Sequence, residues 1–181
     1  MDFLELLLIS KKLHFTDGNV TFYGQHISIA PPTSMAEYIL QSDGDINISK
    51  AIYKIAKKTM MDNTVGFLDA YNKQNVTEWI VNTINLYSIG KIRYENDKVT
   101  LIDTIYLENS VIANTLKGKV KFPSDHIMRG IVGGLVSVIK NEDLECIETE
   151  CEAIGDQYCK LIIGSENYLK SKYSSLCETQ I

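Results

Sequence analysis

The stretch Glu148-Thr149-Glu150-Cys151-Glu152-Ala153-Ile154-Gly155-Asp156-Gln157-Tyr158-Cys159 decides how this chain is interpreted. It carries two thiols eight positions apart across a tight connection. If Ala153 to Asp156 form the turn of a hairpin pairing about 144–152 with 158–163, Cys151 and Cys159 lie on neighbouring strands near its mouth. A soft divalent ion such as zinc binds thiolates at about 2.3 Å and needs two further ligands. The hairpin is therefore a candidate metal site.

Three nearby residues could supply those ligands. Glu148 is close in sequence, and Asp125 or His126 could come from the start of a helix predicted over about 126–140. Glu148 and Cys151 differ by an odd number of residues, so an ideal strand would place them on opposite faces. A bulge or a strong twist would have to bring them together. By spacing alone, burial of the thiols as small apolar side chains stays open beside metal ligation.

Outside the hairpin, residue periodicity predicts a mixed order of elements. The predicted elements are a hairpin at 12–22 turning at Asp17-Gly18, an extended piece ending at Pro31-Pro32, helices starting near Thr33 and covering about 47–72 and 77–87, strands at 92–94 and 99–106 flanking an Asn96-Asp97 turn, a short helix at 110–116, and a polar tail. Regular strand–helix alternation is missing. The prediction is an α+β fold, with an antiparallel sheet and helices packed mainly on one face.

Length and composition bound the class of protein. The chain has 181 residues, 45% hydrophobic and 23% charged, which fits one domain spanning 1–181, with a core of about 12–165 and a C-terminal tail at 166–181. A net charge of -5 and scattered basic residues argue against nucleic-acid binding. No run reaches the roughly 18 apolar residues of a membrane span. The first residues lack the pattern of a secretory signal, so we expect a cytoplasmic protein with reduced thiols.

The sequence offers no catalytic constellation. The three histidines are dispersed, no serine sits in a nucleophile elbow, and no dinucleotide fingerprint is present. We therefore assign no catalytic residues and leave an enzymatic role open as the less favoured alternative. Gly130 and Gly134 share one face of the predicted apolar helix, and we interpret them as helix-on-sheet packing within one subunit.

Large apolar side chains at helical spacing are candidates for a ligand pocket. These candidates are Phe67, Tyr71, Trp79, Tyr87, Met128 and Ile131. Ordinary core packing is the alternative for each of them.

The pattern Glu148-x-x-Cys151-x-Ala153-x-Gly155-Asp156-x-x-Cys159 resembles the end of the 4-vinyl-reductase domain family, which is related in fold to TRAPP-complex subunits. The resemblance is specific over about 122–165 and weaker from residue 13. It implies one zinc ion held by Glu148, Cys151 and Cys159. The family's fourth ligand is usually a cysteine ahead of the glycine-containing helix. Here Asp125 takes that place, with His126 next to it.

The same resemblance implies a function. We expect a module that binds a small hydrophobic or aromatic molecule in a pocket between helices and sheet, acts as a sensor through a partner, and forms a homodimer. The alternatives are a TRAPP-like structural subunit without a ligand, and an accessory factor in tetrapyrrole metabolism.

Overall fold

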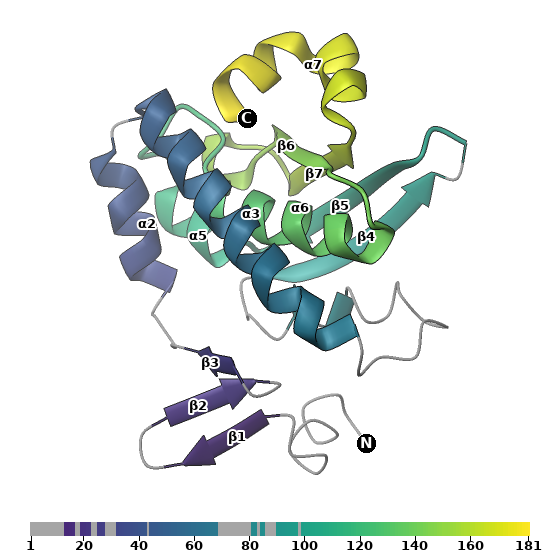
Figure 1. The fold of residues 1–181 in the computed structure, drawn as a ribbon. Coiled ribbons are helices and arrows are strands. Elements are labelled where there is room, and N and C mark those ends of the chain that lie inside the picture. Colours follow the sequence, from purple (N-terminus) through teal and green to yellow (C-terminus); the bar gives the residue numbers. More distant parts are fainter. Residues whose placement is uncertain are drawn as a thin grey trace.

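The computed structural model describes residues 13–16, 19–22, 25–27, 32–42, 44–68, 81–82, 84–85, 90–97 and 99–181. Its elements, in chain order (Figure 1), are β1 (Leu13–Thr16), β2 (Asn19–Phe22), β3 (Gln25–Ile27), α2 (Pro32–Gln41), α3 (Ile46–Leu68), β4 (Lys91–Asp97), β5 (Ile102–Glu108), α5 (Val111–Leu116), α6 (His126–Lys140), β6 (Glu145–Glu150), the 3₁₀ turn η2 (Glu152–Ile154), β7 (Cys159–Gly164) and α7 (Glu166–Gln180). Two antiparallel sheets result, with orders β1-β2-β3 and β4-β5-β7-β6. The predicted α+β class is confirmed.

Strands β1 and β2 pair as the hairpin predicted at 12–22. Its Asp17-Gly18 turn lies outside the described residues, as does Pro31.

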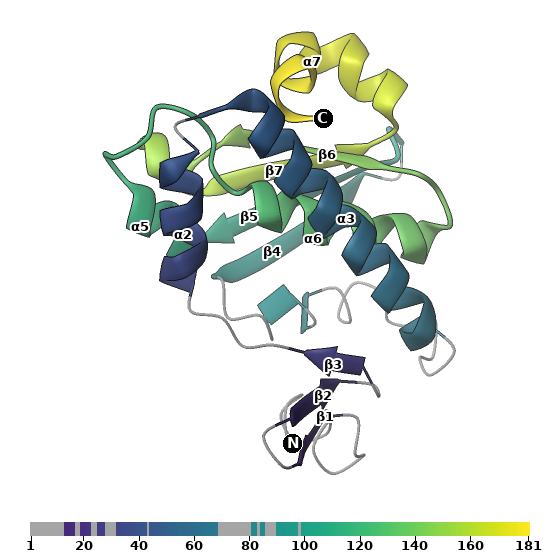
Figure 2. The ribbon, with the colours of Figure 1, turned by 60° about the vertical axis from the view of Figure 1, so that its left-hand side comes forward.

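The larger sheet separates two hydrophobic clusters, because alternate strand residues face opposite sides. Ile105, Leu107 and Leu161 face α6 and belong to the main core. Helix α3 crosses the outer side of α6 (Figure 2), so the main core lies under two layers of helix. Ile147 and Ile162 face the other way and pack with residues of α7. Most helices therefore lie on one face, as expected, and α7 covers part of the other. No helix in the described ranges is long and apolar enough to cross a membrane.

The two glycines expected to pack on the sheet contact a helix instead. A Cβ added to Gly130 would lie 2.5 Å from the Ala56 Cβ, and one added to Gly134 would lie 2.5 Å from the Lys57 carbonyl oxygen. Both neighbours belong to α3. Gly133 is the glycine that faces the sheet, where an added Cβ would lie 3.2 Å from the Cys146 Cβ. The close approach is thus internal to one chain, but it joins helix to helix.

The turn between β4 and β5 differs from the prediction. Asn96 and Asp97 are the last residues of β4, and the turn follows them. The Asp97 carboxylate accepts hydrogen bonds from the Val99 amide at 2.8 Å and the Thr100 hydroxyl at 2.7 Å. Leu101 takes the positive φ of 59°. An aspartate that binds backbone donors two or three residues ahead starts a turn without occupying its centre, which explains the shift.

The expected polar tail at 166–181 is helix α7. Ser165 caps its start by accepting a hydrogen bond from the Tyr168 amide at 3.3 Å, and Tyr173 interrupts the helix with φ -136°. Only three of its residues are buried, among them Leu169 and Cys177. A helix with so few buried positions shows little apolar periodicity, so the sequence pattern did not reveal it.

The last helical residue, Gln180, closes one edge of the larger sheet. Its side chain accepts a hydrogen bond from the Glu148 amide at 2.7 Å and donates one to the Glu148 carbonyl at 2.9 Å. The neighbouring edge groups belong to Cys146. Its amide donates to the Tyr53 hydroxyl at 3.0 Å, and its carbonyl accepts from Arg129 at 3.3 Å. Strand β6 therefore presents no open hydrogen-bonding edge at these two residues.

Replacing Gln180 with alanine should lower the free energy of unfolding by about 2 kcal/mol, because two buried backbone groups of Glu148 lose their partners. Urea denaturation would measure the change. Gln41→Ala is the matched control, since Gln41 is exposed and binds only Glu37. Equal effects of the two variants would contradict the edge-closing role of Gln180.

Candidate metal centre and ligand pocket

A β-bulge brings Glu148 and the two cysteines to one face of the hairpin. The register between β6 and β7 shifts between Glu148 and Glu150. Cys151 follows in an extended conformation, η2 comes next, and Gly155 completes the connection with φ 107°. This is the irregularity that the odd spacing of Glu148 and Cys151 requires.

The two thiols and the carboxylate form a compact buried group. The Sγ atoms of Cys151 and Cys159 lie 4.0 Å apart. The ligand atoms of Glu148, Cys151 and Cys159 all lie within 4.8 Å of one another, and all three residues are fully buried. The Ser124 hydroxyl is 3.7 Å from the Cys151 Sγ. The structure thus brings together three of the sequence-predicted ligands.

Asp125 adds a second buried acid to this group. It stands at the N-cap of α6, where its amide donates to Glu148 Oε2 at 3.0 Å and its Oδ1 accepts from the Ser110 hydroxyl at 3.2 Å. Two carboxylate oxygens, Asp125 Oδ2 and Glu148 Oε1, are buried without a hydrogen-bond partner. Buried polar atoms are nearly always paired, so two such orphans in one cluster point to a missing positive partner.

The pKa values show the same crowding of negative charge. Burial raises the pKa of Asp125 to about 7, with the charge of Cys151 adding to the effect, and burial raises the pKa of Glu148 well above its usual range. A hydrogen bond from Cys159 lowers the pKa of Cys151 to about 5, against the effect of burial. Among the described residues, no lysine or arginine forms a hydrogen bond or ion pair with either acid.

The donor set fits a divalent ion. Two thiolates bound tetrahedrally to one zinc at about 2.3 Å would lie roughly 3.8 Å apart, close to the 4.0 Å found here. Each orphan carboxylate oxygen would then gain the positive partner that it lacks.

His126, the other sequence-predicted ligand, is engaged elsewhere. Its Nδ1 lies 3.0 Å from Arg129 Nη2, and its ring stacks on Phe122 with centroids 6.1 Å apart. Burial and then the arginine charge lower its pKa to about 3, so the ring is neutral at physiological pH. The structure therefore places His126 in the surroundings of Arg129.

Arg129 is a functional candidate that the sequence reasoning missed. It is fully buried, donates to the Cys146 carbonyl at 3.3 Å and to the Gln180 carbonyl at 2.9 Å, and stands 4.8 Å from the centre of the Tyr53 ring. Its charge acts on both Asp125 and Glu148. An arginine inside the otherwise apolar pattern of α6 was the signal available in the sequence.

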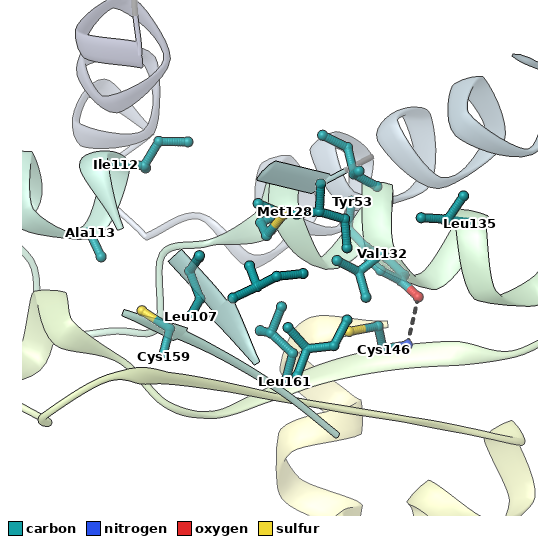
Figure 3. Packing of buried hydrophobic residues seen from close by; sticks show 14 of the residues in the cluster. Tyr53, Leu107, Ile112, Ala113, Met128, Val132, Leu135, Cys146, Cys159 and Leu161 are labelled. Atoms are coloured by element: carbon teal, nitrogen blue, oxygen red, sulfur yellow. Dashed lines mark hydrogen bonds between the residues drawn. The ribbon is translucent and has the colours of Figure 1, made fainter. Parts of the chain in front are cut away.

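The candidate pocket residues are only partly covered by the described structure. Met128 and Ile131 belong to the main core, where Met128 lies among buried side chains that include Tyr53 and Val132 (Figure 3). Phe67 lies in α3, but its side chain is outside the described residues, as are Tyr71, Trp79 and Tyr87 altogether. Residues 81–82 and 84–85 are helical, which agrees with the helix expected over 77–87, and Ile84 joins the main core.

Residues 104–165 match the model of the 4-vinyl-reductase domain family. This chain carries a 4-vinyl-reductase domain. The match spans β5 through β7 and contains every candidate metal ligand. Residues 13–103 lie outside it, so their relationship rests on the fold. No curated protein matches the chain.

Three solved structures resemble the 4-vinyl-reductase domain chain in fold. The phenol-responsive sensory domain of the transcription activator PoxR, crystallised with phenol, has a TM-score of 0.74 at 10% identity, covering 97% of this chain and 96% of that one. A vinyl-4-reductase family protein from Methanocaldococcus jannaschii has a TM-score of 0.52 at 17% identity, covering 76% and 83%. A trafficking protein particle complex subunit 3 from Naegleria fowleri, covalently bound to palmitic acid, has a TM-score of 0.50 at 15% identity, covering 73% and 89%. At these identities the likeness concerns the fold.

Proposed function

We propose that this 4-vinyl-reductase domain chain binds a small hydrophobic or aromatic molecule and serves as a sensor that acts through a partner or through pairing of subunits. The observation that carries the proposal is the match along nearly the whole chain to a phenol-responsive sensory domain. The match includes residues 13–103, which the family model does not cover. Two of the three similar structures are described with a bound apolar or aromatic molecule.

The proposed ligand site lies where the segment 67–87 meets α6. Ile84 belongs to the same buried cluster as Met128 and Ile131, so this segment contributes to the core on the α6 side of the sheet. Phe67, Tyr71, Trp79 and Tyr87 would supply the aromatic walls that such a pocket needs. Met128 and Ile131 would form its floor. A site enclosed by apolar side chains selects an uncharged ligand, because a buried charge without a partner is costly.

The metal belongs to this proposal as a structural element. Glu148, Cys151, Cys159 and Asp125 would hold one zinc ion, and the ion would lock the hairpin against the start of α6. His126 would stay with Arg129. Since Asp125 and Met128 lie within the first turn of α6 and its cap, the metal would also fix one wall of the proposed pocket. The cytoplasmic location expected from the sequence is part of the same proposal, because reduced thiols are needed to hold zinc.

Phenol is the probe that tests the function. Addition of phenol should raise the melting temperature of the wild-type protein, and isothermal titration should give saturable binding. Trp79→Ala should abolish both effects. Tyr38→Ala is the matched control, because Tyr38 is a 61% exposed aromatic residue on α2, and its loss should change neither.

Organic extraction of freshly purified protein, followed by mass spectrometry, tests for a ligand of other chemistry. A co-purifying lipid or aromatic molecule would support the binding function. Empty extracts, together with no response to phenol or substituted phenols, would overturn it in favour of the TRAPP-like structural subunit. An absorption change with a vinyl porphyrin, and none with phenols, would favour the tetrapyrrole alternative.

A further inference from the structure

The two edges of the larger sheet are treated differently. Strand β6 forms one edge, and side chains bind its backbone groups. Strand β4 forms the other edge and pairs only with β5 within the described part of the chain. None of the hydrogen bonds found there, from side chain or backbone, reaches the outer edge of β4. An unpaired edge of seven residues is a template for another strand.

The outward backbone groups of β4 can be identified from the ladder. In an antiparallel sheet, successive residues direct their amide and carbonyl groups to opposite neighbours. At β6 the outward groups belong to Cys146 and Glu148. Following the registers across β7 and β5, the outward groups of β4 belong to Ile92, Tyr94 and Asn96.

The other four residues of β4 carry charges in a self-complementary order. Lys91, Arg93, Glu95 and Asp97 share one face, and all four are exposed. The side chains of Lys91, Arg93 and Glu95 keep 78%, 54% and 51% of their surface exposed. Arg93 and Glu95 form an ion pair with each other, which shows that both lie along the same face. Two positive charges are thus followed by two negative ones.

We propose that two copies of this chain pair through β4, antiparallel and centred on Tyr94. Arg93 then lies opposite Glu95 of the partner subunit, and Lys91 lies opposite Asp97 of the partner subunit. These charged pairs occupy the positions without backbone hydrogen bonds, where cross-strand side chains come closest. The outward groups of Ile92, Tyr94 and Asn96 pair with those of the other copy. The two four-stranded sheets become one of eight strands with two-fold symmetry.

The order of charges specifies this register. A shift of two residues in one direction places Arg93 opposite Arg93 of the partner subunit, and a shift in the other direction does the same with Glu95. Both shifts put like charges together, which is unfavourable. The exposed Val99 and Leu101 at the hairpin tip add apolar surface at each end of the paired strands. Edge pairing of seven residues is small beside a standard interface of about 1,600 Å², so the expected dimer is weak.

Charge reversal tests the pairing. Sedimentation equilibrium of the full chain at low salt should show a reversible dimer. Arg93→Glu alone and Glu95→Arg alone should each raise the dimer dissociation constant roughly ten-fold or more, since each creates two like-charge contacts. Mixing the two single variants should restore association as a heterodimer, because the glutamates at positions 93 and 95 of one copy then face the arginines at positions 95 and 93 of the other. The double variant R93E/E95R should dimerise like the wild type.

Lys58→Glu serves as the control, because it reverses one charge of an exposed ion pair on α3. It should leave the dissociation constant unchanged, and thermal melting should show all variants folded. A wild type that stays monomeric would overturn the proposal. So would a dimer that neither single variant weakens, or single variants that weaken it while their mixture fails to restore it.

Discussion

Protein purified without a histidine tag is expected to contain one zinc ion per chain, and Cys159→Ser is expected to remove it. Loss of the ion should lower the free energy of unfolding by about 4 kcal/mol when free zinc is a thousand-fold above its dissociation constant. The physical reason is the buried pair of acids beside two thiols, whose free oxygens have no other cation bound to them within the described residues. Elemental analysis and urea denaturation would measure the two effects.

Cys146→Ser provides a matched control for this substitution. Cys146 is equally buried, but its sulfur lies outside the candidate cluster. Its replacement should destabilise the core by burying a hydroxyl group and should leave the zinc content at one per chain. If wild-type protein holds no metal and the two variants lose stability alike, Cys159 is only a core residue.

The stabilisation by zinc should also depend on pH. In the metal-free fold Asp125 has a pKa of about 7, above its usual 3.8, so it keeps its proton up to neutral pH. A raised carboxyl pKa stabilises the metal-free fold at low pH, and this contribution is lost as the pH rises through about 7. Zinc must displace that proton. The increase in melting temperature on adding zinc should therefore be largest above pH 7 and should shrink between pH 7 and pH 5.

Gly130→Ala is expected to lower the free energy of unfolding by about 2 to 3 kcal/mol, even though alanine favours helix. The added methyl group would lie 2.5 Å from the Ala56 Cβ and 2.6 Å from the Tyr53 carbonyl oxygen. Neither neighbour can rotate away, because both are fixed to the backbone of α3. Relief requires the two helices to separate, and this would disturb the burial of Tyr53.

Gly133→Ala is the control for this prediction, since it adds the same methyl group to the same helix. Its Cβ would meet the Cys146 Cβ at 3.2 Å, a tight but tolerable distance. Urea unfolding should show a small change for Gly133→Ala, within about 1 kcal/mol, after its gain in helix propensity. Equal effects at positions 130 and 133 would contradict the close crossing of α3 over α6.

The elements with strong local signals were predictable from the sequence. Helix α6 was expected over 126–140 and ends at Asn141, which takes a left-handed conformation. The hairpin of β6 and β7 followed from the alternating residues around the Cys151–Cys159 connection. The β4–β5 turn was misplaced, because an aspartate marks where a turn starts and does not show which residues fill it. Helix α7 was missed because its few buried positions leave no apolar period.

The sequence by itself determined which residues could hold a metal, through the types and spacing of Glu148, Cys151 and Cys159. It left the choice between Asp125 and His126 open, since both stand where α6 begins. Only the tertiary structure separated them, by placing His126 beside Arg129 and Asp125 beside Glu148. Side-chain direction at a helix start depends on what packs against it, and those neighbours come from distant parts of the chain. The same reason explains Gln180, whose partner Glu148 lies 32 residues away and cannot be found from local pattern.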